Sequence, residues 1–331
     1  MKLLSLFLRT ALVLAASTEG THGDLLPEDR KLLEVLRAAQ LTSEAAFPKA
    51  SLKANAEDGY SSQRAVVTAV WDGDRYFCDA EIEDTVTDTD GNTSVSKRLI
   101  MQIGRPSGWD CFFPGKTSLL QRVSDASMTG PKILNIRPRD IWFHPTPDSP
   151  LTWSQRLELQ LAPDSQWDSQ LKDLGNGLIE VSTVSRPSRG RFVATFSMSH
   201  GGNVLEYHSE PISDDVEFRK RGKYEWVSVP PDRWRLKSYV FQIAKKEDTD
   251  YDEYKQKSVE VLEFDPDPVI ASNRFEISSL PLPPGTYVEE YGANERRYRR
   301  GDDKQAEKGI SESKFESLAR ELKQAGFGAK K

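Results

Sequence analysis

Apolar and polar residues alternate with a period of two from residue 64 onward. The stretch RAVVTAVWDGDRYFCDAEIED contains two such runs around the turn Asp72-Gly73-Asp74. Alternation of this kind predicts half-buried strands, and an Asp-Gly turn between them predicts a hairpin. In the second run, one face is apolar and the other acidic, so one side of the predicted sheet is dry and the other wet. The residues of the dry face are Tyr76, Cys78, Ala80 and Ile82, and those of the wet face are Asp79, Glu81 and Glu83.

Further runs extend this pattern into a long antiparallel series. DTDGNTS and RPSG are turns that separate VSKRLIMQIG, WDCFFPG and LLQRVS. After residue 177, the predicted strands are GLIEVSTVS, RFVATFSMS, VLEYHSE, KYEWVSV, RWRLKSYVFQIAK and SVEVLEFD. Two last strands, at 274–280 and 286–291, flank a Leu-Pro-Leu-Pro-Pro-Gly corner. Short strands joined by short turns favour a large curled sheet or an open barrel.

A period of 3.6 predicts helices at only a few places. Residues 24–40 have Pro27 in the first turn and an apolar stripe, which is typical of a packed helix. A polar connector follows, with Pro48 and Gly59. Residues 151–162 and 163–175 predict two short central helices.

The end of the chain changes in composition. Residues 292–309 are highly charged, without an apolar period, and predict a linker. Residues 310–331 predict an amphipathic helix, with a capping box of Ser313 and Glu316. We therefore expect a mainly β fold, a large antiparallel curled sheet or unclosed barrel over residues 24–291, with an N-terminal helix, short central helices and a C-terminal helical tail.

The first 23 residues carry a targeting pattern. MKLLSLFLRTALVLAAS has an early lysine, an apolar run, and Ala15 and Ser17 at the spacing of a signal-peptidase site. We expect cleavage near residue 17 or 23 and export, most simply to the periplasm. The apolar run is far below the ~20 residues of a membrane-spanning helix.

Charge and cysteine content narrow the function classes. The net charge of -6 argues against a nucleic-acid binder. If the turns close hairpins, Cys78 and Cys111 lie on strands that flank a shared middle strand, roughly 9.5 Å apart. A disulfide needs Cα atoms about 4.4–6.8 Å apart, so we expect two separate thiols.

Catalytic and metal-binding motifs are missing. The sequence has no GxSxG, HExxH, GxxxxGK[ST], CxxC or strand-linked GxGxxG. Asp88-Thr89-Asp90-Gly91-Asn92 predicts a hairpin turn, since the later ligands of a calcium loop do not follow. The RRYRR run at 296–300 has acidic neighbours and predicts a solvated linker. We expect no enzyme activity, no cofactor and no metal.

Aromatic residues are the remaining candidates for a site. The chain has seven tryptophans, many of them at strand ends or beside turns. On the concave face of a curled sheet, they either fill a core or line a groove for an acyl chain. The candidate ligand-binding residues are Trp71, Tyr76, Trp109, Phe113, Trp226 and Trp234.

Four stretches, in this order, resemble the lipoprotein-carrier (LolA-like) superfamily, and more closely the carrier-like exported proteins of planctomycete-type bacteria. They are VWDGDRYFCDAE, ILNIRPRDIWF, KYEWVSVPPDRWRLKSY and FEISSLPLPPGTYVEEY, within residues 64–291. The resemblance implies an unclosed barrel whose concave apolar face, lidded by helices, accepts lipid acyl chains without enzyme chemistry or cofactor. This chain is longer, with a proline-rich insertion and a charged tail.

Two functions follow from these features. In the first, the protein binds lipid or lipoprotein acyl chains on the concave face. In the alternative, it is an envelope interaction or sensing scaffold with a packed core, and its C-terminal helix docks an envelope protein. Nothing in the sequence indicates the oligomeric state.

Overall fold

The computed structural model describes residues 25–87, 90–124, 151–162, 165–185, 190–211, 218–245, 251, 256–291 and 295–300. These residues form two α-helices, α2 (Pro27–Glu44) and α3 (Trp153–Leu161). The first six strands are β1 (Lys49–Asp58), β2 (Gln63–Asp72), β3 (Arg75–Thr87), β4 (Thr93–Arg105), β5 (Gly108–Phe113) and β6 (Leu119–Val123). The next seven are β7 (Trp167–Gly175), β8 (Leu178–Ser185), β9 (Gly190–Ser197), β10 (Asn203–Pro211), β11 (Phe218–Val229), β12 (Arg233–Lys245) and β13 (Gln256–Asp265). The last two are β14 (Tyr287–Tyr291) and β15 (Arg296–Arg299).

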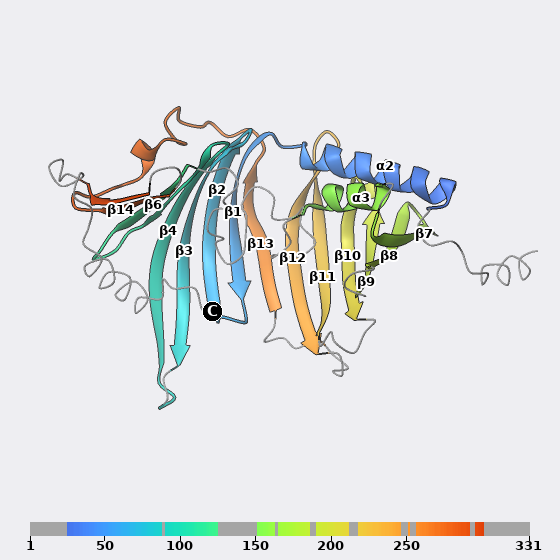
Figure 1. Ribbon diagram of the computed structural model, residues 1–331, viewed down its shortest axis with the longest axis horizontal. Helices are drawn as coiled ribbons and strands as arrows, with labels where there is room; N and C mark the ends of the chain where they lie inside the picture. The colour runs from blue at the N-terminus through green and yellow to red at the C-terminus, as the bar shows by residue number, and fades with distance from the viewer. Residues whose placement is uncertain are drawn as a thin grey trace, which may run out of the picture.

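All the described strands belong to one sheet of 15 strands (Figure 1). Their order is β15-β14-β6-β5-β4-β3-β2-β1-β13-β12-β11-β10-β9-β8-β7. Two antiparallel meanders, β1 to β6 and β7 to β13, therefore join where β1 pairs with β13. The pairing of β14 with β6 is parallel, whereas the other described pairs are antiparallel. The prediction of a mainly β fold with a large antiparallel sheet is confirmed.

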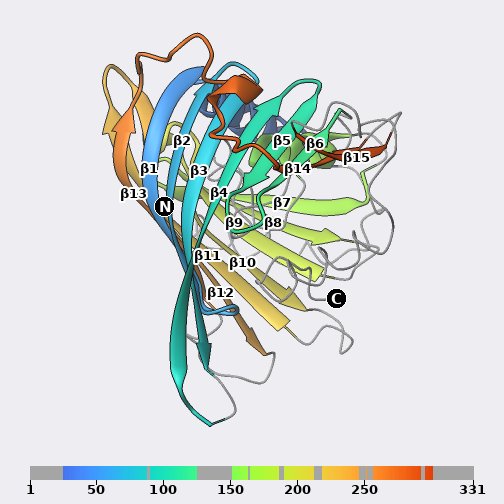
Figure 2. The ribbon, with the colours of Figure 1, turned by 90° about the vertical axis from the view of Figure 1, so that its left-hand side faces the viewer.

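The sheet is curled but not closed. In Figure 2, β13 and β1 lie at the left, and both ends of the sheet turn toward the right. The terminal strands β15 and β7 each have one neighbour in the sheet, so no ladder joins them. The inner face, as used below, is the face that carries Ala56, Ala65 and Tyr207, and the outer face is the opposite one.

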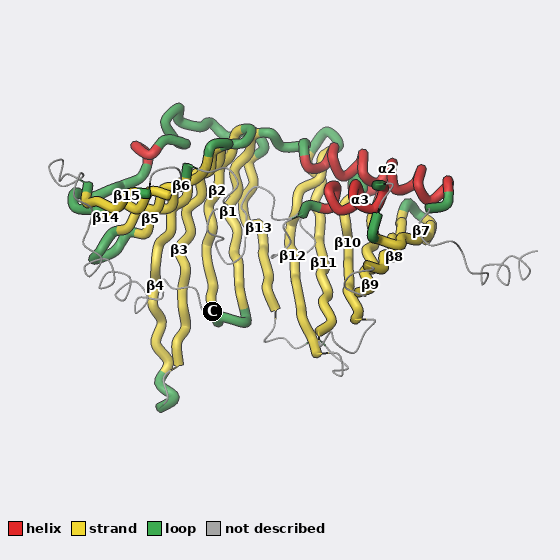
Figure 3. Tube along the Cα trace, in the orientation of Figure 1, coloured by secondary structure: helices red, strands yellow, loops and turns green. Residues whose placement is uncertain are grey.

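Both described helices lie over the β7–β12 half of the sheet (Figure 3). The helix α2 begins at Pro27, with Glu28 and Asp29 in its first turn, where acids favour the positive end of the helix dipole. The helix α3 begins with a capping box between Thr152 and Gln155. They pack on each other and contact β7, and α2 also contacts β10. One half of the inner face thus has a described helical cover.

The main hydrophobic core follows the inner face. Leu33 and Leu36 of α2, and Trp153 and Leu157 of α3, join the inner-face side chains of the strands in this core. A second, smaller core lies on the outer face, at the β3–β6 end. Its buried members are Phe77, Ile103, Phe112, Leu120, Phe275, Leu280 and Val288. The face predicted to be wet is therefore apolar at one end, where residues 266–286 cover it.

Three predicted elements differ from the structure. Residues 49–58, predicted as polar connector, form β1, a central strand paired with both β2 and β13. Residues 167–175, predicted as helix, form β7, because pairing with β8 outweighs a weak helical pattern. Only one short central helix is therefore present among the described residues.

The proline-rich corner also differs in part. Residues 274–280, predicted as a strand, form turns and a 3₁₀ turn at Ile277–Ser279, which lets Phe275 and Leu280 both enter the outer core. The strand predicted after the corner is confirmed as β14. Within the predicted linker at 292–309, β15 pairs with β14, so the sheet continues beyond residue 291. The predicted leader at 1–23 and helix at 310–331 lie outside the described residues.

Candidate functional site

All six candidate aromatic residues lie on the inner face. Trp71 pairs with Tyr76 across β2 and β3, and Tyr76 is in register with Gly104, which is opposite Trp109. Because the strands alternate in direction, the end of β2 and the starts of β3, β5 and β12 meet at one end of the sheet. Trp234 lies near the start of β12 and Trp226 near the end of β11, so both lie at this same end. Phe113 is at the opposite end of β5.

These aromatic side chains are packed within the protein. Trp71 is buried and its Nε1–H donates to the Phe47 carbonyl at 2.8 Å. The Nε1–H of Trp226 donates to the Val204 carbonyl at 2.7 Å. Tyr76 accepts a hydrogen bond from Gln102 Nε2 at 2.9 Å. The Trp234 ring lies 4.5 Å from the ring of His200. Trp71, Tyr76, Trp109, Trp226 and Trp234 therefore form an aromatic rim at one end of the sheet, and Phe113 lies apart from it.

Between this rim and the other end of the sheet, the inner face is lined by alanine, valine and isoleucine side chains. Two rows cross neighbouring strands in register: Val261, Ala54, Val67, Ala80 and Ile100, and next to it Val259, Ala56, Ala65 and Ile82. All nine side chains are buried. We call these nine residues the alanine trough. In Figure 1, α2 and α3 lie away from β1–β4, so no described helix covers this part of the inner face.

On the side away from the aromatic rim, the next row of inner-face side chains after the alanine trough is polar. Lys257 Nζ lies 3.4 Å from Asp58, which it faces in the sheet. Gln63 donates to Asp84, and Arg98 Nε lies 3.0 Å from Asp84. The side chains of these two ion pairs are 8–17% exposed. The alanine trough therefore runs between an aromatic rim and a charged rim whose charges are paired.

Beneath α3, the inner face carries a compact group of aromatic rings. The ring of Trp153 lies 5.6 Å from Phe196 and 5.7 Å from Tyr207. The Tyr224 ring lies 6.4 Å from Tyr207 and 4.7 Å from Tyr239. Tyr239 is opposite Val259, so this group leads directly into the alanine trough.

Three polar atoms within this aromatic group are buried with no partner at hydrogen-bond distance. They are the hydroxyls of Tyr207 and Tyr239 and the Nε1–H of Trp153. Burial raises the pKa of both tyrosines well above the usual value. Native proteins rarely leave buried hydroxyl and indole N–H groups without a hydrogen bond, so this region differs from an ordinary hydrophobic core.

Arg156 projects from α3 onto the same face. Its guanidinium lies 4.2 Å from the centre of the Phe192 ring and 5.0 Å from that of Trp167. No Asp or Glu in the described part of the chain pairs with it. Burial lowers the pKa of Arg156 to about 10, against the opposing effect of the nearby tyrosines.

The two cysteines are separate thiols, as predicted. Cys78 and Cys111 are both in register with Gln102 on the middle strand, β4. Both are buried and free. Burial raises the pKa of each thiol far above its usual value, which keeps them protonated and unreactive.

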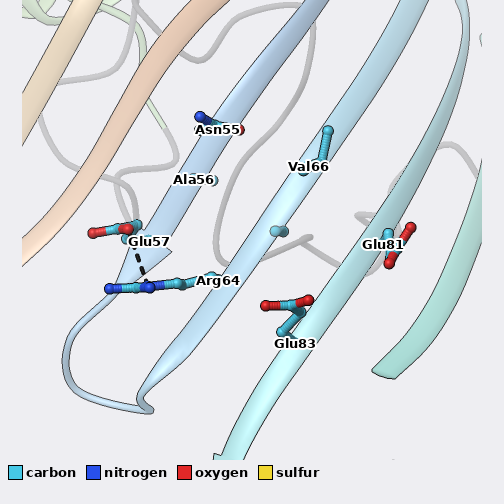
Figure 4. Close-up of a pocket in the computed structure, with 8 residues that line it drawn as sticks. Asn55, Ala56, Glu57, Arg64, Val66, Glu81 and Glu83 are labelled. Atoms are coloured by element: carbon cyan, nitrogen blue, oxygen red, sulfur yellow. Dashed lines mark ion pairs between the residues drawn. The ribbon is translucent and has the colours of Figure 1, made fainter. Parts of the chain in front are cut away.

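On the outer face, below the second core, a shallow polar depression of about 230 Å³ lies over β1 to β3 (Figure 4). Its ion pair joins Arg64 Nε to Glu57 at 3.1 Å. Glu81 and Glu83 also line it, and Lys97 lies 3.2 Å and 2.6 Å from them. Since these acids are exposed and paired with bases, the depression is a solvated charged surface.

The described residues contain no cluster of three or more His, Cys, Asp or Glu side chains placed to hold a metal ion. Neither α2 nor α3 has the length and apolar content needed to cross a membrane.

Comparison with known proteins gives little further information. No protein-family model and no curated protein matches the sequence. A porin-like protein from Bacteroides uniformis is a distant structural match, which covers 65% of this chain and 95% of that protein, with 9% sequence identity and a TM-score of 0.26. Similarity at this level carries no inference about function. The resemblance to lipoprotein carriers therefore stays a prediction.

Sequence reasoning found the aromatic rim but missed the alanine trough and Arg156. Ala54 and Ala56 lie in the segment predicted as a connector. The alternation of Ala50, Leu52, Ala54 and Ala56 with polar residues was the available signal. Nothing in the sequence around Arg156 distinguishes it from a surface arginine on an amphipathic helix.

Proposed function

We propose that this protein is a non-catalytic, exported binding protein that accommodates a lipid or lipoprotein acyl chain along the alanine trough. The observation that carries the proposal is the composition of that trough. Four of its nine side chains are alanine, Ala54, Ala56, Ala65 and Ala80, whereas a sheet packed on itself is normally filled by larger residues. An apolar floor of this kind suits a flexible hydrocarbon chain.

The borders of the trough support an amphiphilic ligand. The aromatic rim closes one side, and the charged rim of Asp58, Lys257, Asp84 and Arg98 closes the other. A hydrocarbon chain lying between them would contact only apolar atoms. Because the trough residues are buried in the unliganded protein, binding must be coupled to an opening of this face.

Native mass spectrometry of the protein purified from cells tests this proposal. We expect adducts of lipid mass that organic extraction removes and that added palmitate restores. A protein that never carries or accepts such mass contradicts the proposal. Palmitate should also displace a fluorescent fatty acid in solution, which provides an affinity for comparing variants.

A matched pair of variants locates the ligand. Ala65→Phe fills the trough and is expected to weaken palmitate binding by about tenfold or more. Val66→Phe places the same side chain on the outer face, where Val66 is 41% exposed, and should leave binding unchanged. Ala65→Leu is a smaller replacement for use if the phenylalanine variant unfolds. Equal affinities for the inner and outer variants would place the ligand elsewhere.

A second function is favoured by one observation. The indole N–H groups of Trp71 and Trp226 are satisfied by backbone carbonyls inside the core, as in a permanent scaffold. In that case, the protein would be an envelope interaction or sensing module, and residues 310–331 would dock a partner protein. This alternative predicts no lipid adduct and unchanged stability in the presence of palmitate.

A further inference from the structure

We infer that the region beneath α3 is an anion site, in which Arg156 and the hydroxyls of Tyr207 and Tyr239 bind the charged head group of the ligand. The ligand class is an acyl chain that ends in an anionic oxygen group, a carboxylate or a phosphate. This inference rests on the proposed function, since it places the head of the same ligand whose chain lies in the alanine trough.

Arg156 carries a charge that no described acid neutralises. Its guanidinium lies over two aromatic faces, which partly desolvate it. The cations of the charged rim differ, since Lys257 and Arg98 already have carboxylate partners. Among these inner-face cations, Arg156 alone lacks an acid partner in the described residues. It is therefore the one that can accept an anionic ligand without first breaking an ion pair.

The buried hydroxyls of Tyr207 and Tyr239 are a separate observation that does not depend on charge. The Tyr207 and Tyr239 hydroxyls interact with each other, and Tyr239 with Tyr224, but neither has a partner at hydrogen-bond distance. Both tyrosines are at least nine-tenths buried. An unpaired buried hydroxyl carries a desolvation penalty, which a ligand oxygen would relieve. Since burial keeps both phenols protonated, each is able to donate a hydrogen bond to an anion.

The sheet register brings these groups together. Phe192, under the Arg156 guanidinium, shares the inner face of β9 with Ala194, which is opposite Tyr207. Tyr224 links Tyr207 to Tyr239 through ring contacts of 6.4 Å and 4.7 Å. Arg156 also acts electrostatically on Tyr207. The positive charge thus lies at the β9 side of the aromatic group, next to Tyr207 on β10, and Tyr239 lies at the β12 side of the same group.

The same register connects this site with the trough. From Tyr239, the row continues through Val259, Ala56 and Ala65 to Ile82. These five residues lie on consecutive strands and span four strand spacings, or about 19 Å. A head group at Arg156 and Tyr239 therefore leaves the chain aligned with the apolar row. The ligand would therefore lie across the strands, with its head group at the β12 end of this row and its chain running toward β3.

The test compares three probes of equal chain length on the full-length mature protein: palmitate, hexadecyl phosphate and uncharged hexadecanol. We expect one or both anions to bind about tenfold or more tightly than hexadecanol. The tighter anion identifies the head group. If hexadecanol binds as well as both anions, this inference is wrong but the proposed function stands. If none of the three binds, the proposed function itself fails.

Variants then assign the residues. Arg156→Met keeps the length of the side chain, and should abolish the preference for the anion while leaving hexadecanol binding unchanged. Arg64→Met, on the outer face, is the matched control and should change neither. Tyr239→Phe removes only the hydroxyl, and we expect weaker anion binding, by a few-fold, with no loss of stability in the unliganded protein. Parallel loss of hexadecanol and palmitate binding in these variants would indicate a structural role and overturn the inference.

Discussion

The ring of Tyr207 lies directly over Gly222, its partner on the neighbouring strand β11. A Cβ atom at Gly222 would come within 2.1 Å of the tyrosine ring. The same arrangement occurs in the other meander, where Tyr76 covers Gly104 and a Cβ atom would come within 1.9 Å. Glycine in a strand interior normally weakens the strand, so these two glycines are explained by the close approach of a ring.

The first prediction concerns this contact. Gly222→Ala forces the Tyr207 ring out of its position, and should lower the free energy of unfolding by about 1–3 kcal/mol. Gly115→Ala is a matched control, because its nearest atom, the Thr117 carbonyl oxygen, is 3.9 Å from the new Cβ. Urea denaturation of both variants measures the difference. Equal stabilities would show that the ring moves aside at no cost.

A second prediction concerns the buried carboxylate of Asp110, which is 1% exposed. It accepts from Arg105 and, at 3.1 Å, from Arg122 Nε. Arg122 in turn donates to Glu290 at 2.9 Å, which ties β5 and β6 to β14. Asp110→Asn leaves Arg105 without a counter-charge and Arg122 with Glu290 alone, and should cost about 3 kcal/mol in urea denaturation.

The control for this variant is Asp72→Asn. The pair of Asp72 and Arg75 is 47% exposed on both sides, so its loss should change stability by less than about 1 kcal/mol. Similar losses in the two variants would contradict the importance assigned to burial.

A third prediction concerns the segment that covers the outer core. Phe275 is buried there, and the guanidinium of Arg75 lies 5.0 Å from its ring centre. Phe275→Ala should destabilise the protein by about 3 kcal/mol and expose residues 266–286 to limited proteolysis. Val269→Ala, in the same segment but fully exposed, should do neither. Unchanged cleavage in the Phe275 variant would mean that other contacts hold this segment.

A fourth prediction concerns alkaline pH. Burial raises the folded-state pKa of Tyr207, Tyr224 and Tyr239, and raises that of Tyr291 to about 12. In the unfolded chain, tyrosine ionises near pH 10. Between pH 10 and 12, the unfolded state therefore binds fewer protons than the folded state, and stability falls as pH rises.

Arg156 acts in the opposite direction over the same range. Its folded-state pKa of about 10 is below that of an unfolded arginine, so its contribution to stability rises with pH. One arginine opposes four tyrosines, and the net expected result is a loss of stability. Urea denaturation at several pH values measures this loss, and Tyr239→Phe should reduce its slope. Stability that is constant from pH 9 to 11 would contradict the buried state of these phenols.

A fifth prediction concerns the thiols. Because Cys78 and Cys111 are fully buried and protonated, neither should react with Ellman's reagent at pH 8 in the folded protein. In guanidinium chloride, two thiols per chain should react without reductant. Detection of fewer than two under denaturing conditions would indicate a disulfide, contrary to the register.

Much of the fold was accessible from the sequence, since strands with strong alternation and tight turns were predicted correctly. The hairpin at Asp72-Gly73-Asp74 and the shared partner of Cys78 and Cys111 follow from turn chemistry and a period of two. β1 was missed because its inner positions are mostly alanine, which has low strand propensity. β7 was missed because its edge position leaves most side chains exposed, so no apolar alternation marks it.

The candidate site was less predictable. The six aromatic residues share one face, which alternation indicated, but their packing depends on partners far along the chain. Arg156 is unusual because its guanidinium lies over the rings of Phe192 and Trp167. These three residues are on α3, β9 and β7, respectively, and only the folded arrangement of those elements brings them together. Phe275 and Leu280, predicted on a strand before the proline corner, instead reach an outer core that strand pairing alone could not reveal.

The pairing of β1 with β13 and of β6 with β14 has a consequence for biosynthesis. The amino-terminal meander is made first, yet both strands that border it come from the last part of the chain. During synthesis, the edges of β1 and β6 therefore stay unpaired until residues 256–265 and 287–291 have been made. Unpaired strand edges attract other chains, so this interval is when the protein most needs a chaperone.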